Sequence, residues 1–143
     1  MQQQRNEPGI YTLILSLSQA EQIEVGSLGV IDFASGFYSY TGSARGPGGL
    51  KRVDRHILVM DGIKKTQRWH IDYLLPYTSL VEVFITKTTQ DLECSIANAL
   101  GKQLIAVPRF GCTDCRCPSH LHYSQELQKM RDSAAAAHRA AMI

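Results

Sequence analysis

Hydrophobic residues divide the first third of the chain into short β-type segments. Residues 9–17 (GIYTLILSL) are apolar and rich in β-branched and aromatic residues after a Pro-Gly pair, which predicts a buried strand. Residues 22–42 contain three further β-prone runs, at 23–25, 30–33 and 37–41, with glycines between them. Short runs separated by glycine are typical of hairpins, so we expect a meander of strands in this region.

The spacing then becomes helical. Leu50, Val53, Ile57 and Met60 recur on one face of a predicted helix that Asp61-Gly62 ends. A second short helix is expected over residues 66–75, with Pro76 after its end. Trp69, Tyr73 and Leu74 are the candidates for its buried side. The remaining expected elements are a strand at 80–86, a helix ending at Gly101, a short strand at 104–107 and an alanine-rich helix after Ser124.

Composition is that of a single globular domain. The 143 residues are 44% hydrophobic and 20% charged, which is enough apolar material for a core. We place the domain at residues 1–124 and a C-terminal Ala-rich helical tail, with little to bury, at 125–143. No apolar run approaches the roughly 20 residues of a membrane helix, and the N-terminus has no apolar signal core. We therefore expect a soluble, cytoplasmic protein.

Positive charge is concentrated between residues 41 and 69. That segment contains seven Lys or Arg residues and two Asp residues, a net +5, whereas the rest of the chain is net −3. Such a concentration suits a surface that meets a phosphate backbone, and a solvated helix surface is the alternative. Within it, Arg52 and His56 are four residues apart and project from one helical face, after glycines that let backbone approach an anion.

Two tyrosines and one glutamate complete a candidate hydrolytic set. Tyr11 and Tyr40 lie on strands that should pair, and a phenol can orient water, or act as a base if a nearby cation lowers its pKa. Glu93 lies near the start of an otherwise apolar helix and could hold one hydrated Mg²⁺. Each also has a structural interpretation: packing for the tyrosines and a helix-dipole contact for the glutamate.

The ordered set resembles the GIY-YIG nuclease superfamily. Gly9-Ile10-Tyr11 and Tyr40-Thr41-Gly42 are similar to its two tripeptides, and Arg52 with His56 and then Glu93 follow in the same order. Segments 40–49, 69–75 and 110–123 resemble a branch of small stand-alone GIY-YIG domains. The resemblance implies an α+β fold in which a small central antiparallel sheet is flanked by helices. The long segment between the tripeptides adds a hairpin to that fold.

The resemblance also implies metal-dependent cleavage of nucleic acid, with DNA as the expected partner and a DNA-repair protein as a further one. Glu93 would bind Mg²⁺ or Mn²⁺, Arg52 would stabilise the phosphate, and Tyr11 would activate or position water. Tyr40 and His56 would assist. The residues expected to contact nucleic acid are Ser43, Arg45, Lys51, Arg55, Arg68 and His70.

A Cys/His segment follows the last predicted strand. Its soft side chains are a candidate Zn²⁺ site, with Cys112, Cys115, Cys117 and His120 as the ligands. Structural zinc sites usually combine two separated ligand pairs, so a compact loop of reduced thiols is the alternative.

Three function classes therefore follow from the sequence: a divalent-metal-dependent endonuclease, a nucleic-acid-binding module without turnover, and a zinc-stabilised interaction domain.

Overall fold

The computed structural model describes residues 7–44, 48–111 and 117–141. Along the chain the strands are β1 (Gly9–Leu17), β2 (Glu21–Glu24), β3 (Val30–Phe33), β4 (Gly36–Ala44), β5 (Ser79–Lys87), β6 (Ile105–Ala106) and β7 (Leu121–Ser124). The helices are α1 (Lys51–Met60), α2 (His70–Leu74), α3 (Glu93–Gly101) and α4 (Leu127–Ala141). Two short 3-10 turns, η2 (Gly26–Leu28) and η3 (Leu75–Tyr77), complete the description.

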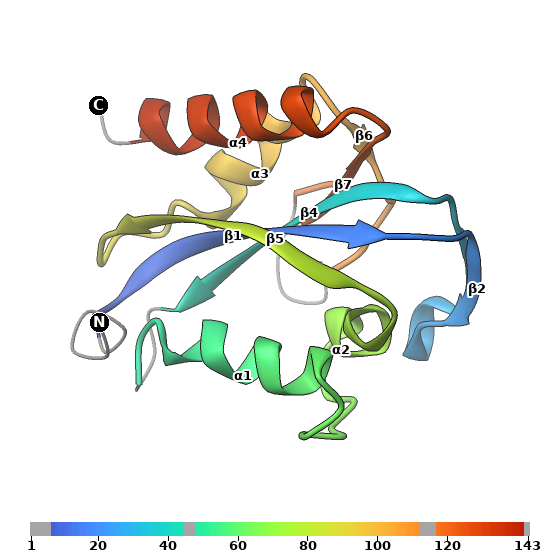
Figure 1. Cartoon of the computed structure of the whole chain (residues 1–143). Helices are drawn as coiled ribbons and strands as arrows, with labels where there is room; N and C mark the ends of the chain where they lie inside the picture. The colour runs from blue at the N-terminus through green and yellow to red at the C-terminus, as the bar shows by residue number, and fades with distance from the viewer. Residues whose placement is uncertain (1–6, 45–47, 112–116, 142–143) are drawn as a thin grey trace.

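Five strands form one antiparallel sheet in the order β5-β1-β4-β7-β6. The strands β2 and β3 pair only with each other and form the predicted extra hairpin between the tripeptides. Figure 1 shows the sheet between two layers of helices, with α1 and α2 on one side and α3 and α4 on the other. The predicted α+β class, a central antiparallel sheet flanked by helices, is confirmed.

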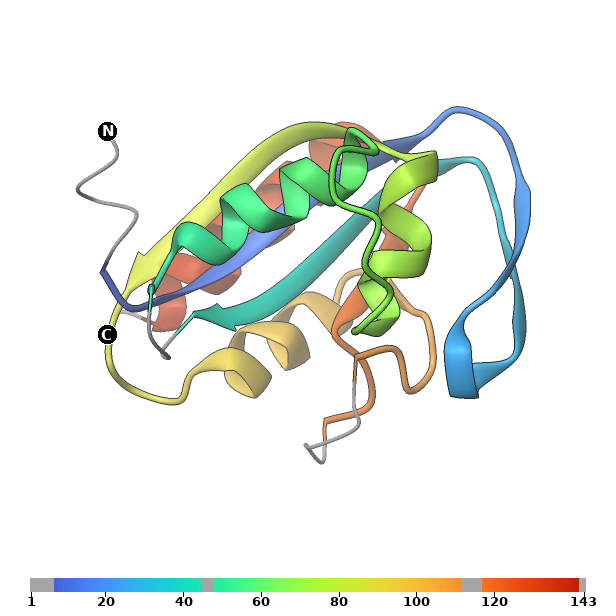
Figure 2. The same ribbon diagram turned by 90° about the horizontal axis from the view of Figure 1, so that it is seen from below.

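The interior strand β1, between β5 and β4, is buried on both faces, and its side chains alternate between two cores. Tyr11, Leu13 and Leu15 pack toward α1 and α2 in the larger core, whereas Ile10 and Ile14 pack with α3 and α4. Figure 2 shows α1 in front of the sheet and α4 behind it. The sequence of a strand that is covered on both sides is a nearly continuous apolar run, which is why residues 9–17 lack a polar face.

The second helix is shorter than predicted, and its buried face is only partly as predicted. Residues 66–69 are not helical, and α2 begins at His70 because the Asp72 carboxylate accepts hydrogen bonds from the backbone N–H of Arg68 and Trp69. Such a capping contact fixes the start of a helix. The buried residues of α2 are Ile71, Asp72 and Leu74. The prediction of a buried Leu74 is confirmed, whereas Trp69 and Tyr73 are only partly buried and pack at the edge of the larger core.

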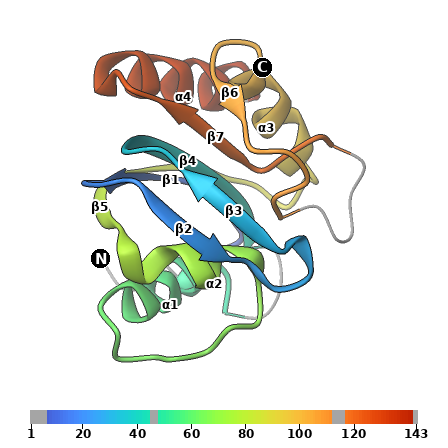
Figure 3. The ribbon, with the colours of Figure 1, turned by 90° about the vertical axis from the view of Figure 1, so that its right-hand side faces the viewer.

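Two further elements differ from the sequence expectation. The Cys/His segment, predicted to be loop, contains β7, which pairs with β4. The C-terminal helix α4 covers the sheet and buries Met130, Ala134, Ala137 and His138 rather than having little to bury. His138 bonds Thr12 Oγ1 through Nε2 at 2.7 Å and Thr86 Oγ1 through Nδ1 at 2.8 Å. Figure 3 shows α4 lying along the sheet on the side of β7. Small alanine side chains let a helix pack closely against a sheet. The division at residue 124 stays a prediction.

Within the described residues, no helix is both long and apolar enough to cross a lipid bilayer.

Candidate functional site

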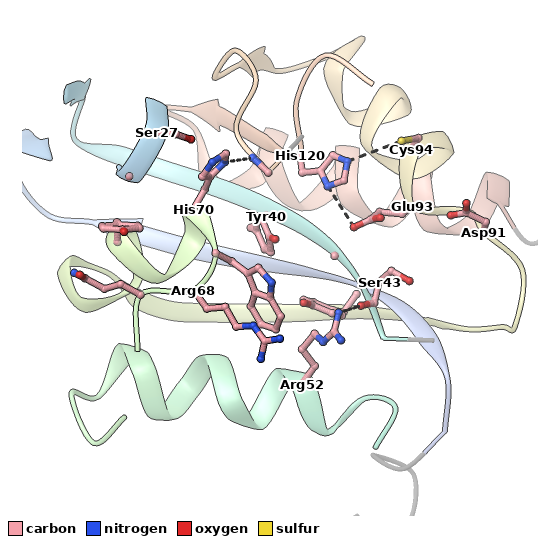
Figure 4. A pocket seen from close by; sticks show the side chains of 17 residues that line it. Ser27, Tyr40, Ser43, Arg52, Arg68, His70, Asp91, Glu93, Cys94 and His120 are labelled. Carbon is pink, nitrogen blue, oxygen red and sulfur yellow. Dashed lines mark hydrogen bonds and ion pairs between the residues drawn. The ribbon is translucent and has the colours of Figure 1, made fainter. Parts of the chain in front are cut away.

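A cleft of about 520 Å³ opens on the side of the sheet that carries α1 and α2, and it reaches the start of α3. Four residues predicted to be catalytic line it together: Tyr11 from β1, Tyr40 from β4, Arg52 from α1 and Glu93 from α3. Figure 4 shows Tyr40 between Arg52 and Arg68 on one side and Glu93 with His120 on the other. The cleft therefore has a basic wall on one side and, facing it, a wall of carboxylate, imidazole and thiol groups.

The basic wall consists of Trp69 and three arginines. The guanidinium carbons of Arg55, Arg52 and Arg68 lie 4.0, 4.9 and 5.7 Å from the centroid of the indole ring. Cation–π contacts of this kind orient a guanidinium over an aromatic face. Arg52 Nη1 also donates to the Ser43 carbonyl oxygen at 2.7 Å, which holds this side chain at the edge of the cleft. Arg52 and Arg68 present the positive charge of the wall to the cleft.

Arg55 has a different environment from Arg52. Its Nη1 and Nη2 donate to Oδ1 and Oδ2 of Asp72 at 3.1 and 3.0 Å, and the Asp72 side chain is fully buried. Burial alone would raise the pKa of Asp72, but Arg55 and the backbone N–H groups of Trp69 and Arg68 hold that pKa below its ordinary value. A bidentate pair with these extra donors fixes Arg55 and the chain around Trp69 in one arrangement. Arg55 does not line the cleft, so its structural task is to support the wall.

Tyr11, which lines the cleft, is hydrogen-bonded to His56 behind it, and both side chains are buried. The phenol oxygen lies 2.7 Å from His56 Nε2. Burial and the neighbouring Arg55 lower the pKa of His56 to about 3, so its imidazole is neutral. Burial, with Tyr40 nearby, raises the pKa of Tyr11 well above its ordinary value, and the lowering effect of Arg52 is smaller. Of the two roles that the sequence left open for a phenol, this environment favours orienting water over acting as a base, because the phenol is neutral at neutral pH.

Gly42, the last residue of the second tripeptide, makes room for this pair. It lies directly opposite Tyr11 in the register of β1 and β4. A Cβ at position 42 would collide with the Tyr11 phenol oxygen and ring. Glycine is needed here because the tyrosine ring crosses the backbone of its partner strand.

The opposite wall joins α3 to the segment before β7. His120 Nδ1 lies 3.3 Å from Glu93 Oε2, and His120 Nε2 lies 2.8 Å from Cys117 Sγ and 3.9 Å from Cys94 Sγ. His120 and Cys117 are buried, whereas the Glu93 side chain is 22% exposed. At the far end of the cleft, His70 Nδ1 accepts the backbone N–H of Gly111 at 2.8 Å.

Comparison with known proteins places the chain in a family. The model of the domain of unknown function DUF123 matches residues 10–143, from the second residue of β1 through α4. The chain belongs to the DUF123 family. No curated protein and no solved structure gives a significant match.

The DUF123 fold brings together most, but not all, of the predicted site residues. Of the expected nucleic-acid contacts, Ser43, Arg68 and His70 line the cleft, whereas Lys51 is exposed on α1 and outside the lining. His56 lies behind Tyr11 and is fully buried. The predicted residues Arg45, Cys112 and Cys115 lie outside the described residues.

Sequence reasoning missed two members of the site. Cys94 was not among the predicted zinc ligands, and it lies 18 or more residues before the other cysteines in the chain. Trp69 was assigned to packing, although three basic residues within the charged segment surround it. The one signal in the sequence for Cys94 was its position directly after Glu93. The signal for Trp69 was the clustering of arginines around it.

Proposed function

We propose that this DUF123 protein is a divalent-metal-dependent endonuclease that hydrolyses phosphodiester bonds in nucleic acid, with DNA as the substrate. The observation that carries the proposal is the convergence of Tyr11, Tyr40, Arg52 and Glu93, from four elements, on one cleft. Hydrolysis of a phosphodiester needs a positioned water, a cation beside the developing negative charge and a group near the leaving oxygen. The opposed walls of the cleft can supply these three functions.

Each residue has a distinct task in this proposal. Arg52 contacts a non-bridging phosphate oxygen, because its guanidinium is held at the edge of the cleft by Ser43 and Trp69. Glu93 binds one hydrated Mg²⁺ or Mn²⁺, since a single carboxylate with waters is a common arrangement for Mg²⁺. Tyr11 stays protonated and orients the attacking water through its hydroxyl group.

The neutral His56 supports this orienting role of Tyr11. The 2.7 Å contact between its Nε2 and the phenol oxygen fixes the position of the hydroxyl group. The low pKa of His56 keeps a positive charge away from the phenol, so the pair does not change protonation near neutral pH. The Tyr40 ring packs edge-on against the His56 ring, with 5.9 Å between the ring centroids. Tyr40 also lines the cleft, so it can contact the substrate.

The proposal includes membership of the GIY-YIG superfamily, supported by the two tripeptides on adjacent antiparallel strands and by Arg52 and Glu93 facing one cleft. It also includes a cytoplasmic location, because four clustered cysteines suit a reducing compartment, and a DNA-repair partner protein.

Cleavage assays with Mg²⁺ or Mn²⁺ test the proposal over duplex, nicked, branched and single-stranded substrates. Arg52→Ala should lower the rate by about 100-fold or more, as expected for loss of a charge-stabilising donor. Lys51→Ala is the matched control, because Lys51 neighbours Arg52 on α1 and lies outside the cleft lining. Glu93→Gln should remove metal-dependent cleavage. Absence of cleavage of every substrate by the wild-type protein, or equal rates for Arg52→Ala and Lys51→Ala, would reject the proposal.

A second candidate is a nucleic-acid-binding module without turnover, favoured by the arginine and tryptophan side chains of the basic wall. Such a wall can bind a phosphate backbone and stack against a base without a metal ion. Trp69 is the only tryptophan of the chain, so quenching of its fluorescence reports binding directly. Salt-sensitive binding that persists in Glu93→Gln, together with no cleavage by wild type, would select this function.

A further inference from the structure

Three soft donor atoms meet beside the cleft. Cys94 Sγ, Cys117 Sγ and His120 Nε2 all lie within 4.8 Å of one another. We call these residues the thiol–imidazole cluster. Cys94 comes from the first turn of α3, whereas Cys117 and His120 come from the segment that leads into β7. Cys94 and His120 also line the cleft, as Figure 4 shows for their side chains, so the cluster is reachable from solvent on one side.

The spacing suits a metal ion. In a tetrahedral Zn²⁺ site with the usual Zn–S and Zn–N bond lengths, ligand atoms lie about 3.5 to 3.8 Å apart. The distance from Cys94 Sγ to His120 Nε2 is 3.9 Å, close to that value. Cys117 Sγ is nearer to the same nitrogen, at 2.8 Å, and would move away by about 0.8 Å on binding. Two thiolates and an imidazole are a donor set typical of zinc rather than of magnesium or manganese.

The second nitrogen of His120 has the partner that metal-binding histidines usually have. Glu93 Oε2 lies 3.3 Å from His120 Nδ1, on the opposite side of the ring from the two sulfur atoms. A carboxylate in this position fixes the tautomer with the proton on Nδ1, which leaves the Nε2 lone pair for a metal. Glu93 has a second oxygen, so this contact is compatible with a hydrated cation on the cleft side.

We propose that Cys94, Cys117 and His120 bind one Zn²⁺ ion and that Glu93 orients His120 as the outer carboxylate of this site. The ion would tie the start of α3 to the segment before β7 and so set the position of Glu93 at the cleft. Both thiols lose their protons on binding, and the fourth position is filled by water or a further ligand. This inference does not rest on nuclease activity.

A nucleophilic Cys-His-Glu triad is the main competing explanation of the same contacts. A triad needs one thiol on the imidazole nitrogen and a nucleophile that the substrate can reach. Here two sulfur atoms approach the same nitrogen, and the nearer one belongs to Cys117, which is buried and outside the cleft lining. Both features favour a metal site over a nucleophile.

Metal analysis of the purified full-length protein tests the proposal. Wild type should take up one equivalent of Zn²⁺, and Co²⁺ in its place should give the intense thiolate-to-cobalt charge-transfer absorption of a sulfur-ligated tetrahedral site. Failure to take up a stoichiometric ion, or a Co²⁺ spectrum without thiolate charge transfer, overturns the proposal. This readout uses wild type alone, so it holds even where a variant fails to fold.

Substitutions then identify the ligands. Cys94→Ser should lower Zn²⁺ affinity by more than the roughly 10- to 100-fold expected for Glu93→Gln, which removes only an outer-sphere contact. Cys94→Ser is decisive because a site confined to the segment from Cys112 to His120 would not respond to it. His70→Asn is the matched histidine control, since His70 lines the same cleft outside the cluster and should keep full affinity. Unchanged affinity in Cys94→Ser would overturn the proposed ligand set. A wild-type protein that binds zinc but cleaves no substrate would count against the nuclease proposal alone.

Discussion

The buried ion pair between Arg55 and Asp72 offers the sharpest test of how the basic wall is held. Asp72→Asn preserves the side-chain shape, and the amide oxygen can still accept from the backbone N–H groups of Arg68 and Trp69. Both backbone groups donate to Oδ2, so the NH₂ group would take the place of Oδ1 and face Arg55 Nη1, which now has an acceptor at 3.1 Å. Arg55 would remain charged with only 17% of its side chain exposed.

The expected loss follows from this geometry. Removing one partner of a buried pair costs about 3–5 kcal/mol, since the other charge stays uncompensated. Two backbone contacts survive and Arg55 reaches some solvent, so we expect about 3 kcal/mol, the lower end of that range. Urea unfolding followed by Trp69 fluorescence and by far-ultraviolet circular dichroism measures it. Asp61→Asn, an exposed carboxylate at the end of α1, should stay within about 0.5 kcal/mol of wild type.

A double-mutant cycle separates the pair from general disruption. Arg55→Met combined with Asp72→Asn removes the stranded charge, so the double variant should lose less than the sum of the single losses, by at least about 1 kcal/mol. Because the folded-state pKa of Asp72 is below its ordinary value, the stabilisation is present above the unfolded pKa and is lost as pH falls through the folded one. The difference between wild type and Asp72→Asn should therefore shrink below about pH 4. Additive single effects, or a difference unchanged by acid, would refute the reasoning.

Three further predictions concern the sheet and its two faces. Gly42→Ala should push the Tyr11 ring away from His56 and lower the free energy of unfolding by about 1–3 kcal/mol, measured by urea unfolding. An unchanged free energy of unfolding would mean that the ring can move freely. Tyr11→Phe removes the hydroxyl group but keeps the ring, so cleavage should fall at least about 10-fold while far-ultraviolet circular dichroism is unchanged; equal rates would remove Tyr11 from the mechanism. Burial lowers the pKa of His138 from 6.5 to about 4, so the unfolded chain takes up the proton first. The free energy of unfolding should therefore fall by up to about 3 kcal/mol as the pH drops from 6.5 to 4. His138→Gln should make this pH dependence less steep, and an equal slope in both proteins would contradict this account.

The sequence by itself determined the elements whose signal is local. The alternation and runs of apolar residues predicted β1, the β2 and β3 hairpin and β5, and the spacing of Leu50, Val53 and Met60 predicted α1. Periodicity of this kind depends on neighbours within one turn or one strand, so it is readable without the fold. The order of Tyr11, Tyr40, Arg52 and Glu93 also predicted a common site, and these four residues do line one cleft.

Only the tertiary structure decided what surrounds those residues. Nothing local to Arg55 indicates that it pairs with Asp72 rather than facing a ligand, and nothing local to His56 indicates that it lies buried against Tyr11. Cys94 reaches Cys117 and His120 because β7 pairs with β4 while α3 packs beside them. Burial, charge partners and the resulting pKa shifts arise from residues far apart in the chain, and sequence spacing carries no information on such contacts until the strands are paired.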